Sequence, residues 1–331
     1  MTALQEPGRD PASTGEPVTG AGRADMHGRR PQLGAWAYFE GAVVPIEQAT
    51  VSIATHGLNY GTSVFEGIRA YRQEDASSAV LFGVEHYNRL LWNARLLRAA
   101  VPETAAELVQ ITVDLLRRNR HAGDAYVRPL VYKSAASIRL QLGDLDDRVS
   151  IFTMPLGDYL PTAGIRVTVS GWQRVSDNAI PARGKIAGSY VNAALAAEDA
   201  RAASYDDAIL LTADGHVAEA SSANVFMVTG REVATPPLVD DVLPGITRGA
   251  VIQIARDAGH EVVERRIDRS ELYLADELFL TGTGVQVAPI ASIDGRPVGS
   301  SEFPVSLEIQ RRYFAAVRGD DGRYAHWLTP I

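Results

Sequence analysis

Apolar residues recur along the chain with two different periods, and together these predict both helices and strands. In the segment 85–100, Leu90, Ala94 and Leu97 fall on one side of a helix, while Arg98 can reach solvent. The helices expected from such spacing cover about 85–100, 103–120, 188–203, 246–258 and 302–317.

Short apolar or alternating segments bounded by turn residues predict strands. Two of them flank a turn at Glu40-Gly41, and the clearest alternation is Ile-Arg-Val-Thr-Val-Ser at 165–170. We also expect a loop at 56–61, before the strand at 63–71. The other strands are expected at 63–71, 79–82, 125–132, 149–154, 208–212, 224–228, 233–235, 261–267 and 277–281. Since helices and strands are interspersed without an internal repeat, we expect a mixed α/β protein.

Turn-forming residues indicate how the chain divides. Residues 1–32 are rich in Gly, Pro, Arg and Asp with few large apolar side chains, which is typical of a disordered tail. The stretch 155–161 holds two prolines and one glycine, which suits a linker. We therefore expect a tail at 1–32, a small α/β domain at 33–154, an interdomain linker at 155–162 and a larger domain at 163–331.

Composition excludes several classes of function. The 331 residues are 46% hydrophobic and 22% charged, as in ordinary globular proteins. No apolar run approaches the roughly 20 residues that cross a bilayer, and a net charge of -8 argues against nucleic-acid and anionic-membrane partners. The absence of cysteine excludes disulfides and thiol chemistry and favours a cytoplasmic location.

Lysine usage directs attention to two positions. Of the 32 basic residues, only Lys133 and Lys185 are lysines, although composition bias in the coding DNA would also produce that skew. A lysine is required where an amine must lose its proton and form a Schiff base, because guanidinium stays protonated. Lys133 resembles an ordinary strand-end residue. Lys185 has small neighbours, as in Gly184-Lys185-Ile-Ala-Gly188, which would let a planar cofactor approach; otherwise it is a surface lysine in a glycine-rich loop.

Three further segments carry candidate chemistry. Residues 243–248, Leu-Pro-Gly-Ile-Thr-Arg, precede a helix whose first amides could bind an anion, or could simply form a capped helix start. The turn 281–284 would expose amides. Glu219 could hold a pyridine nitrogen protonated if buried, or could be a hairpin charge facing water. The seven histidines lack metal-ligand spacing, so no metal site is expected, and neither a P-loop nor GxGxxG is present.

Taken together, these segments resemble the fold type IV family of pyridoxal-phosphate enzymes, and within it the branched-chain amino acid aminotransferases. The resemblance runs from about residue 36 to about 290. Its most specific pieces are His56-Gly-Leu-Asn-Tyr-Gly-Thr-Ser-Val-Phe-Glu-Gly-Ile-Arg-Ala-Tyr71, Tyr126-Val-Arg-Pro129, the Lys185 segment and residues 243–248. The fold that it implies has a smaller N-terminal α/β domain and a larger C-terminal domain with a β-barrel-like core.

The resemblance also implies residue roles. Lys185 would hold pyridoxal 5'-phosphate covalently and later move a proton, Glu219 would pair with its ring nitrogen and Tyr190 with its phenolic oxygen. The full set of implied cofactor residues is Arg89, Lys185, Tyr190, Glu219, Leu243, Ile246, Thr247 and Thr283. The implied substrate residues are Tyr60, Phe65, Gly67, Tyr126, Arg128, Leu156, Tyr159, Gly282, Thr283 and Gly284. Among these, Tyr126 and the turn at 282–284 would receive the α-carboxylate, and Arg128 would help accept the distal carboxylate of glutamate.

The implied reaction is transamination of L-Leu, L-Ile and L-Val with 2-oxoglutarate, giving branched-chain 2-oxo acids and L-glutamate. The implied assembly is a homodimer or larger homo-oligomer, in which residues 134–147 reach the partner's pocket. Three departures leave the substrate open: Leu156 replaces a frequent tryptophan, Gly284 replaces a frequent alanine, and 134–147 diverges. The alternatives are a specialised biosynthetic aminotransferase for another L-amino acid, a D-amino acid transaminase, an aminodeoxychorismate lyase and a binding protein without catalysis.

Overall fold

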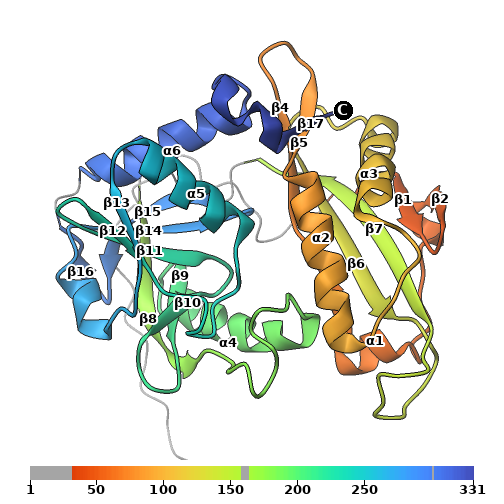
Figure 1. Cartoon of the computed structure of the whole chain (residues 1–331). Coiled ribbons are helices and arrows are strands. Elements are labelled where there is room, and N and C mark those ends of the chain that lie inside the picture. The colour runs from red at the N-terminus through yellow and green to blue at the C-terminus, as the bar shows by residue number, and fades with distance from the viewer. Residues whose placement is uncertain (1–31, 158–163, 300–301) are drawn as a thin grey trace, which may run out of the picture. The chain divides into compact units, whose positions relative to one another are not determined.

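The computed structural model describes residues 32–157, 164–299 and 302–331, and their strands form two sheets (Figure 1). Residues Gln32–Ile331 belong to one compact unit. Residues 1–31 of the predicted tail at 1–32 and residues 158–162 of the predicted linker at 155–162 lie outside the described residues. The division of the chain into domains therefore stays a prediction.

The first sheet is antiparallel and has the order β17-β5-β4-β6-β7-β1-β2, with β3 pairing to β6. Its strands are β1 (Trp36–Phe39), β2 (Ala42–Pro45), β3 (Ser63–Phe65), β4 (Ile68–Arg72), β5 (Ser78–Leu81), β6 (Ala125–Lys133), β7 (Asp147–Pro155) and β17 (Leu328–Pro330). The helices in this part are α1 (His56–Tyr60), α2 (Gly83–Ala94) and α3 (Ala105–Asn119). Because α2 and α3 are amphipathic, their apolar sides bury Leu90 and Leu108 against Val127 of the sheet.

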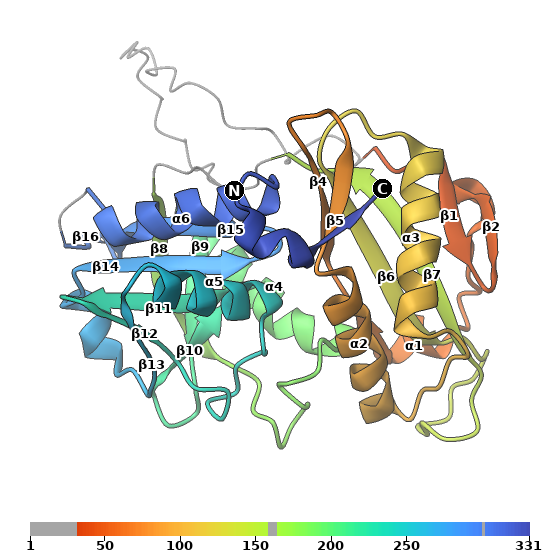
Figure 2. The same cartoon turned by 45° about the horizontal axis from the view of Figure 1, so that its top comes forward.

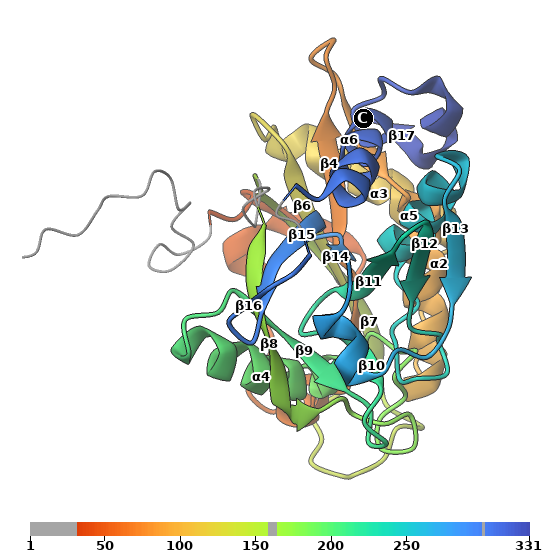
Figure 3. The same ribbon diagram turned by 90° about the vertical axis from the view of Figure 1, so that its left-hand side faces the viewer.

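The second sheet is mixed and has the order β10-β9-β8-β15-β14-β11-β12-β13, with β16 pairing to β15; Figure 3 views it from the side. Its strands are β8 (Ile165–Gln173), β9 (Asp207–Leu211), β10 (Val217–Ala220), β11 (Asn224–Thr229), β12 (Glu232–Thr235), β13 (Glu261–Glu264), β14 (Glu277–Gly282), β15 (Gln286–Ile293) and β16 (Arg296–Pro297). Its helices are α4 (Tyr190–Ala202), α5 (Ile246–Asp257) and α6 (Pro304–Val317). Ile254 of α5 and Ile309 of α6 share a core with the stacked rings of Phe226 and Phe279.

The end of the chain returns to the first sheet. After α6 and a 3-10 turn at Gly322–Trp327, β17 pairs antiparallel to β5, and the Ile331 amide donates to the Ser78 carbonyl at 2.8 Å (Figure 2). The last residues thus connect the helix that covers the second sheet to the edge of the first.

Most predicted elements are confirmed within a few residues, and the mixed α/β class is confirmed. The loop predicted at 56–61 is wrong, because His56–Tyr60 form a short helix that ends at Gly61 in the left-handed conformation. The strand predicted at 63–71 is divided at Glu66 and Gly67. The strands β10, β15, β16 and β17 were not predicted. Of these, β15 has Pro289 paired to Phe279 inside it, although proline is rare inside paired strands.

Candidate active site

The amine of Lys185 lies beside a tyrosine hydroxyl. Its Nζ donates to Tyr190 Oη at 2.8 Å and is 5.0 Å from the centre of the Phe65 ring. The lysine backbone is fixed as well, since the Lys185 carbonyl accepts from the Phe65 amide at 3.1 Å. Next to it Gly61 packs on Gly188, where an added Cβ would come within 2.7 Å of the Gly188 Cα. These close contacts hold a half-buried amine next to a phenol, and this environment favours a chemical role.

Lys133 has a different environment. It is buried, donates to the Arg98 carbonyl at 2.9 Å and forms an ion pair with Asp147, also at 2.9 Å. Its amine is therefore used to hold the fold together, and Lys185 is the candidate for chemistry.

Glu219 is a buried residue of β10, so the alternative of a hairpin charge facing water is wrong. Its Oε1 lies 2.9 Å from Nε of Arg174, and its Oε2 accepts from the Asn224 side-chain amide and the Leu243 backbone amide, both at 3.1 Å. Burial raises the pKa of Glu219, while the charge of Arg174 opposes that rise. No local pattern indicated Arg174, because it lies 45 residues from its partner in an ordinary polar stretch.

Arg89 extends from α2 and meets a buried carboxylate that sequence reasoning did not single out. Its Nε and Nη2 donate to Glu66 at 2.6 and 2.8 Å, and its Nη1 donates to the Pro244 carbonyl at 2.7 Å. His86, one turn earlier on the helix, donates from Nδ1 to Glu66 at 2.8 Å. Although burial opposes the charge, Arg89 and His86 hold the pKa of Glu66 well below its usual range. A guanidinium has five N–H groups, so Arg89 keeps donors for a further anion.

The N-terminus of α5 adds amides to the same end of the site. The helix begins at Ile246, and among the residues described no side chain caps it. The first backbone N–H groups, including those of Ile246 and the buried Thr247, therefore lack intrahelical partners and suit an anion such as phosphate. Pro244, whose carbonyl binds Arg89, lies just before this helix.

At the other end, Tyr126 and Arg128 share one face of β6 because side chains alternate along a strand. Arg128 donates to Tyr126 Oη from Nε at 3.1 Å and from Nη2 at 2.7 Å, and stacks 4.5 Å from the Phe65 ring centre. Since that oxygen accepts twice, its own proton remains free to be donated to an anion. Gly67 is required here, because a Cβ would lie 2.4 Å from Tyr126 Oη.

Arg69 is buried and holds the predicted carboxylate-binding turn. Its Nε donates to the Thr283 carbonyl at 2.8 Å, and its Nη2 donates to the Gly284 carbonyl at 3.0 Å and the Gly157 carbonyl at 3.1 Å. A weaker contact joins Nη1 to the Leu156 carbonyl at 3.4 Å. Arg69 therefore anchors the backbone of the turn 282–284 through the carbonyls of Thr283 and Gly284. Arg69 had no predicted role.

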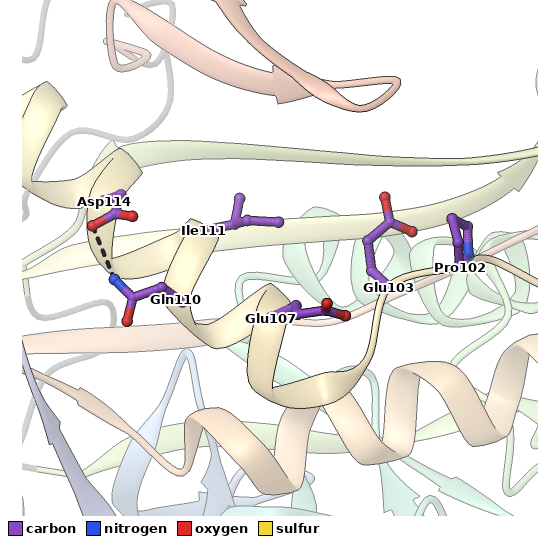
Figure 4. Close-up of a pocket in the computed structure, with 6 residues that line it drawn as sticks. All are labelled: Pro102, Glu103, Glu107, Gln110, Ile111 and Asp114. Carbon is purple, nitrogen blue, oxygen red and sulfur yellow. Dashed lines mark hydrogen bonds between the residues drawn. The ribbon is translucent and has the colours of Figure 1, made fainter.

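The remaining predicted residues are less connected. Tyr60 donates to the Ile138 carbonyl at 2.9 Å and is 40% exposed, so in this chain it faces the 134–147 segment. Tyr159 lies outside the described residues. A hollow on α3 is a separate feature of the surface (Figure 4). It is lined by Pro102, Glu103, Glu107, Gln110, Ile111 and Asp114 and includes no predicted site residue.

The groups gathered here match the parts of pyridoxal 5'-phosphate one by one. An amine beside a phenol suits its aldehyde and phenolic oxygen, a buried carboxylate suits its ring nitrogen, and a guanidinium with a helix N-terminus suits its phosphate. Lys185 is among the charges that lower the pKa of the buried Glu219, and Glu219 and Tyr190 are among those that raise the pKa of Arg89, so these groups lie within electrostatic reach of one another. The donor set fits the cofactor and defines a pyridoxal-phosphate enzyme. Among the described residues no cluster of His, Asp or Glu could hold a metal ion.

Comparison with known proteins gives the family. Residues 63–293 match amino-transferase class IV, and the chain belongs to that family of pyridoxal-phosphate-dependent aminotransferases. A relative named probable branched-chain-amino-acid aminotransferase, from Aquifex aeolicus, is 46% identical over 89% of this chain and 96% of its own. The branched-chain-amino-acid aminotransferase of Escherichia coli (strain K12) is 36% identical over 89% of this chain and 97% of its own.

Solved structures agree with this assignment. The branched-chain aminotransferase of Thermoproteus uzoniensis with norvaline has a TM-score of 0.86 at 41% identity and covers 89% of this chain and 98% of its own. The T.th. branched-chain amino acid aminotransferase complexed with N-(5'-phosphopyridoxyl)-L-glutamate has a TM-score of 0.87 at 39% identity. The match covers 91% of this chain and 99% of that one. The fold type IV architecture is therefore confirmed. Separately, no helix in the described part of the chain is long and apolar enough to cross a membrane.

Proposed function

We propose that this enzyme transfers the amino group of L-Leu, L-Ile and L-Val to 2-oxoglutarate, giving branched-chain 2-oxo acids and L-glutamate. The observation that carries the proposal is the carboxylate end of the site, where Tyr126 has a free proton and Arg69 fixes the turn at 282–284. The names of the relatives support the choice of side chain. The norvaline and phosphopyridoxyl-glutamate complexes of the neighbours support an apolar and an acidic substrate in one pocket.

Different residues would hold different parts of the cofactor. Arg89, the amides of Ile246 and Thr247, and Thr283 would bind the phosphate. Leu243 belongs to the proposed cofactor set through its amide, which donates to Glu219. Glu219 would hold the ring nitrogen and Tyr190 the phenolic oxygen. When bound, pyridoxal phosphate supplies an electron sink for charge that develops at the substrate Cα.

Lys185 is the base in this proposal. Its amine would bind the cofactor at rest and, once released by substrate, would move the proton at Cα. Tyr190 is hydrogen-bonded to that amine at 2.8 Å and would keep it aimed. This contact, with the buried Glu219, argues against a binding protein without catalysis.

The substrate would be oriented by the groups that bind its carboxylate. Tyr126 and the turn Gly282–Gly284 would receive the α-carboxylate, and Arg128 would add positive charge for the distal carboxylate of glutamate. Phe65, Gly67 and Leu156 would form the remaining wall, and Tyr60 and Tyr159 complete the proposed substrate set. Aromatic and aliphatic walls accept a branched side chain without burying an unpaired charge.

A homodimer is part of the proposal. Around α1 and the 134–147 segment, Ile53, Leu58, Ile138 and Leu140 are 62% to 88% exposed. His56 and Tyr60 bind the carbonyls of Arg139 and Ile138, so the two segments form one apolar surface. Such a surface is costly in water and suits a second copy of the chain.

The test is an assay of purified protein with pyridoxal phosphate, 2-oxoglutarate and a panel of L- and D-amino acids. Fast turnover of L-Leu, L-Ile and L-Val, with their D-forms inert, supports the proposal. Preference for L-Phe or L-Met would indicate a specialised aminotransferase, and D-amino acid turnover or pyruvate release from aminodeoxychorismate would overturn the assignment. Sedimentation of Leu140→Asp beside the parent protein tests the dimer, which this charge should weaken.

A further inference from the structure

We propose that Arg174 is a positioning residue that keeps Glu219 ionised, so that the carboxylate can hold a proton on the ring nitrogen of the cofactor. This inference rests on the proposed placement of that nitrogen against Glu219. It gives a role in the reaction to a residue outside the predicted site.

The two oxygens of Glu219 have different partners. Oε1 faces the Arg174 guanidinium at 2.9 Å, and Oε2 accepts from the neutral amides of Asn224 and Leu243 at 3.1 Å. The Arg174 backbone is anchored too, because its amide donates to the Leu211 carbonyl at 2.8 Å. Each side chain of the ion pair is 10% exposed. The cation is thus fixed against the carboxylate in a largely dry place.

In such a place a carboxylate without a cation would take up a proton, because burial penalises its charged form. Burial does raise the pKa of Glu219, and the largest opposing influence is the charge of Arg174. A protonated Glu219 would offer a hydrogen to the ring nitrogen instead of accepting one. The ring would then lose the positive charge that makes it a strong electron sink.

Arg89 also interacts electrostatically with Glu219 but has Glu66 as its ion-pair partner. Lys185 is a further cation whose charge reaches Glu219. Its charge changes with its own chemistry, since an amine that acts as a base gains and loses protons. Arginine stays protonated at every working pH. Arg174 is therefore suited to supply a constant counter-charge throughout the reaction.

A purely structural role is the competing explanation. Buried ion pairs contribute little net stability compared with apolar residues of similar size, so stability alone is a weak reason for this pair. The two explanations differ in what they predict for the ring nitrogen. A structural residue would change stability and leave the protonation of the cofactor as it was.

The experiment uses holoenzyme reconstituted with pyridoxal phosphate that carries nitrogen-15 in the ring. The nitrogen chemical shift, which reports protonation, is followed from about pH 6 to about pH 9 in the parent protein and in Arg174→Met, Arg174→Lys and Glu219→Gln. Arg166→Met is the matched control, because Arg166 lies on β8, the strand that leads to Arg174, and its side chain is 50% exposed. Urea unfolding of each apo-protein measures stability separately.

We expect a protonated nitrogen in the parent, the control and Arg174→Lys, and an unprotonated one in Glu219→Gln. In Arg174→Met the apparent pKa of the ring nitrogen should fall by about one unit or more, which is the usual effect of one close charge. At saturating cofactor the kcat of that variant should fall about tenfold or more, and KM should change less. The double variant that combines Arg174→Met with Glu219→Gln should match Glu219→Gln alone, because both changes remove the same ionised carboxylate.

The outcomes separate the two proposals. If Glu219→Gln keeps a protonated nitrogen, the proposed role of Glu219 fails. If Glu219→Gln loses the proton while Arg174→Met keeps it, Arg174 has no such role and the proposed function stands. Loss of the proton in Arg174→Lys, or additive losses in the double variant, would also overturn the inference. Should Arg174→Met fold poorly, Arg174→Gln replaces it under the same criteria.

Discussion

Replacing Glu66 by glutamine should reveal how strongly the phosphate end of the site depends on one buried charge. Glu66 is fully buried, and both of its oxygens accept from Arg89, at 2.6 and 2.8 Å. His86 donates a third hydrogen bond to it at 2.8 Å. Glutamine keeps the shape of the side chain but removes the charge and one acceptor. Arg89, whose side chain is only 12% exposed, then loses its counter-charge.

The size of the effect follows from burial. Removing one partner of a buried ion pair leaves an uncompensated charge and costs about 3–5 kcal/mol. Glutamine retains one carbonyl oxygen for Arg89, so we expect a loss near the lower limit, about 3 kcal/mol at pH 7. The freed guanidinium can also change its orientation, and cofactor affinity should fall with it.

The direction of the pH dependence is fixed by the lowered pKa of Glu66. In the unfolded chain a glutamate titrates at about pH 4.3, whereas in the folded protein it stays ionised to lower pH. The stabilisation is therefore fully present above about pH 4.3 and is lost as pH falls toward the folded pKa. The difference between parent and variant should be constant from about pH 6 to 7 and shrink below about pH 4.

Urea unfolding of the apo-proteins at several pH values measures this difference, and titration with pyridoxal phosphate measures affinity. Glu85→Gln is the control, since Glu85 is exposed on the same helix and should change stability by less than about 0.5 kcal/mol. A loss below about 1 kcal/mol for Glu66→Gln at pH 7, or a loss that does not depend on pH, would refute the argument that the pair acts through charge.

Three further changes test other parts of the site. Tyr190→Phe removes the hydroxyl that binds the Lys185 amine and should lower kcat about ten- to a hundredfold with a shifted absorption band of the bound cofactor, measured by rapid-scanning spectroscopy. Arg69→Met frees the turn at 282–284 and should raise the apparent Kd of 4-methylpentanoate about tenfold or more in an absorption titration. With 3-methylbutylamine, which lacks the carboxylate, that variant should react like the parent protein. Leu156→Trp should narrow the pocket and raise preference for Val and Ile over Phe and Met; unchanged ratios of kcat/KM would contradict a widened pocket.

Local patterns explain what could be predicted from the sequence. The spacing of Leu90, Ala94 and Leu97 places them in one core, and the structure buries all three. Likewise Lys185 and Tyr190 are only five positions apart, on either side of the 3-10 turn at Ala187–Ser189, so their contact depends mainly on local geometry. The helices and most strands were predictable for the same reason.

Partners distant in sequence explain what could not be predicted. Arg69 lies inside the quoted motif, yet its hydrogen bond to Thr283 joins positions 214 residues apart. Glu66 lies in the same motif, and its ion pair with Arg89 forms only when β3 packs on α2. Glu219 was open to two interpretations because nothing near it in sequence reveals burial. Charge pairs of this kind depend on the tertiary fold, and a single sequence does not show them.

The positions of Arg69 and Arg89 show how the two halves of the chain form one site. Both belong to the part built on the first sheet, and both donate to backbone carbonyls from the second half, at Thr283 and Pro244. Each contact fixes a backbone segment whose amides are the proposed anion donors, one for the substrate carboxylate and one for the cofactor phosphate. Arg69 gives its N–H groups to carbonyls and would act on the substrate carboxylate through the backbone that it holds, whereas Arg89 keeps N–H groups that would also bind the phosphate directly. The distance between the two anion sites is then set by the fold, which suits an enzyme that must hold one cofactor while exchanging two different acids.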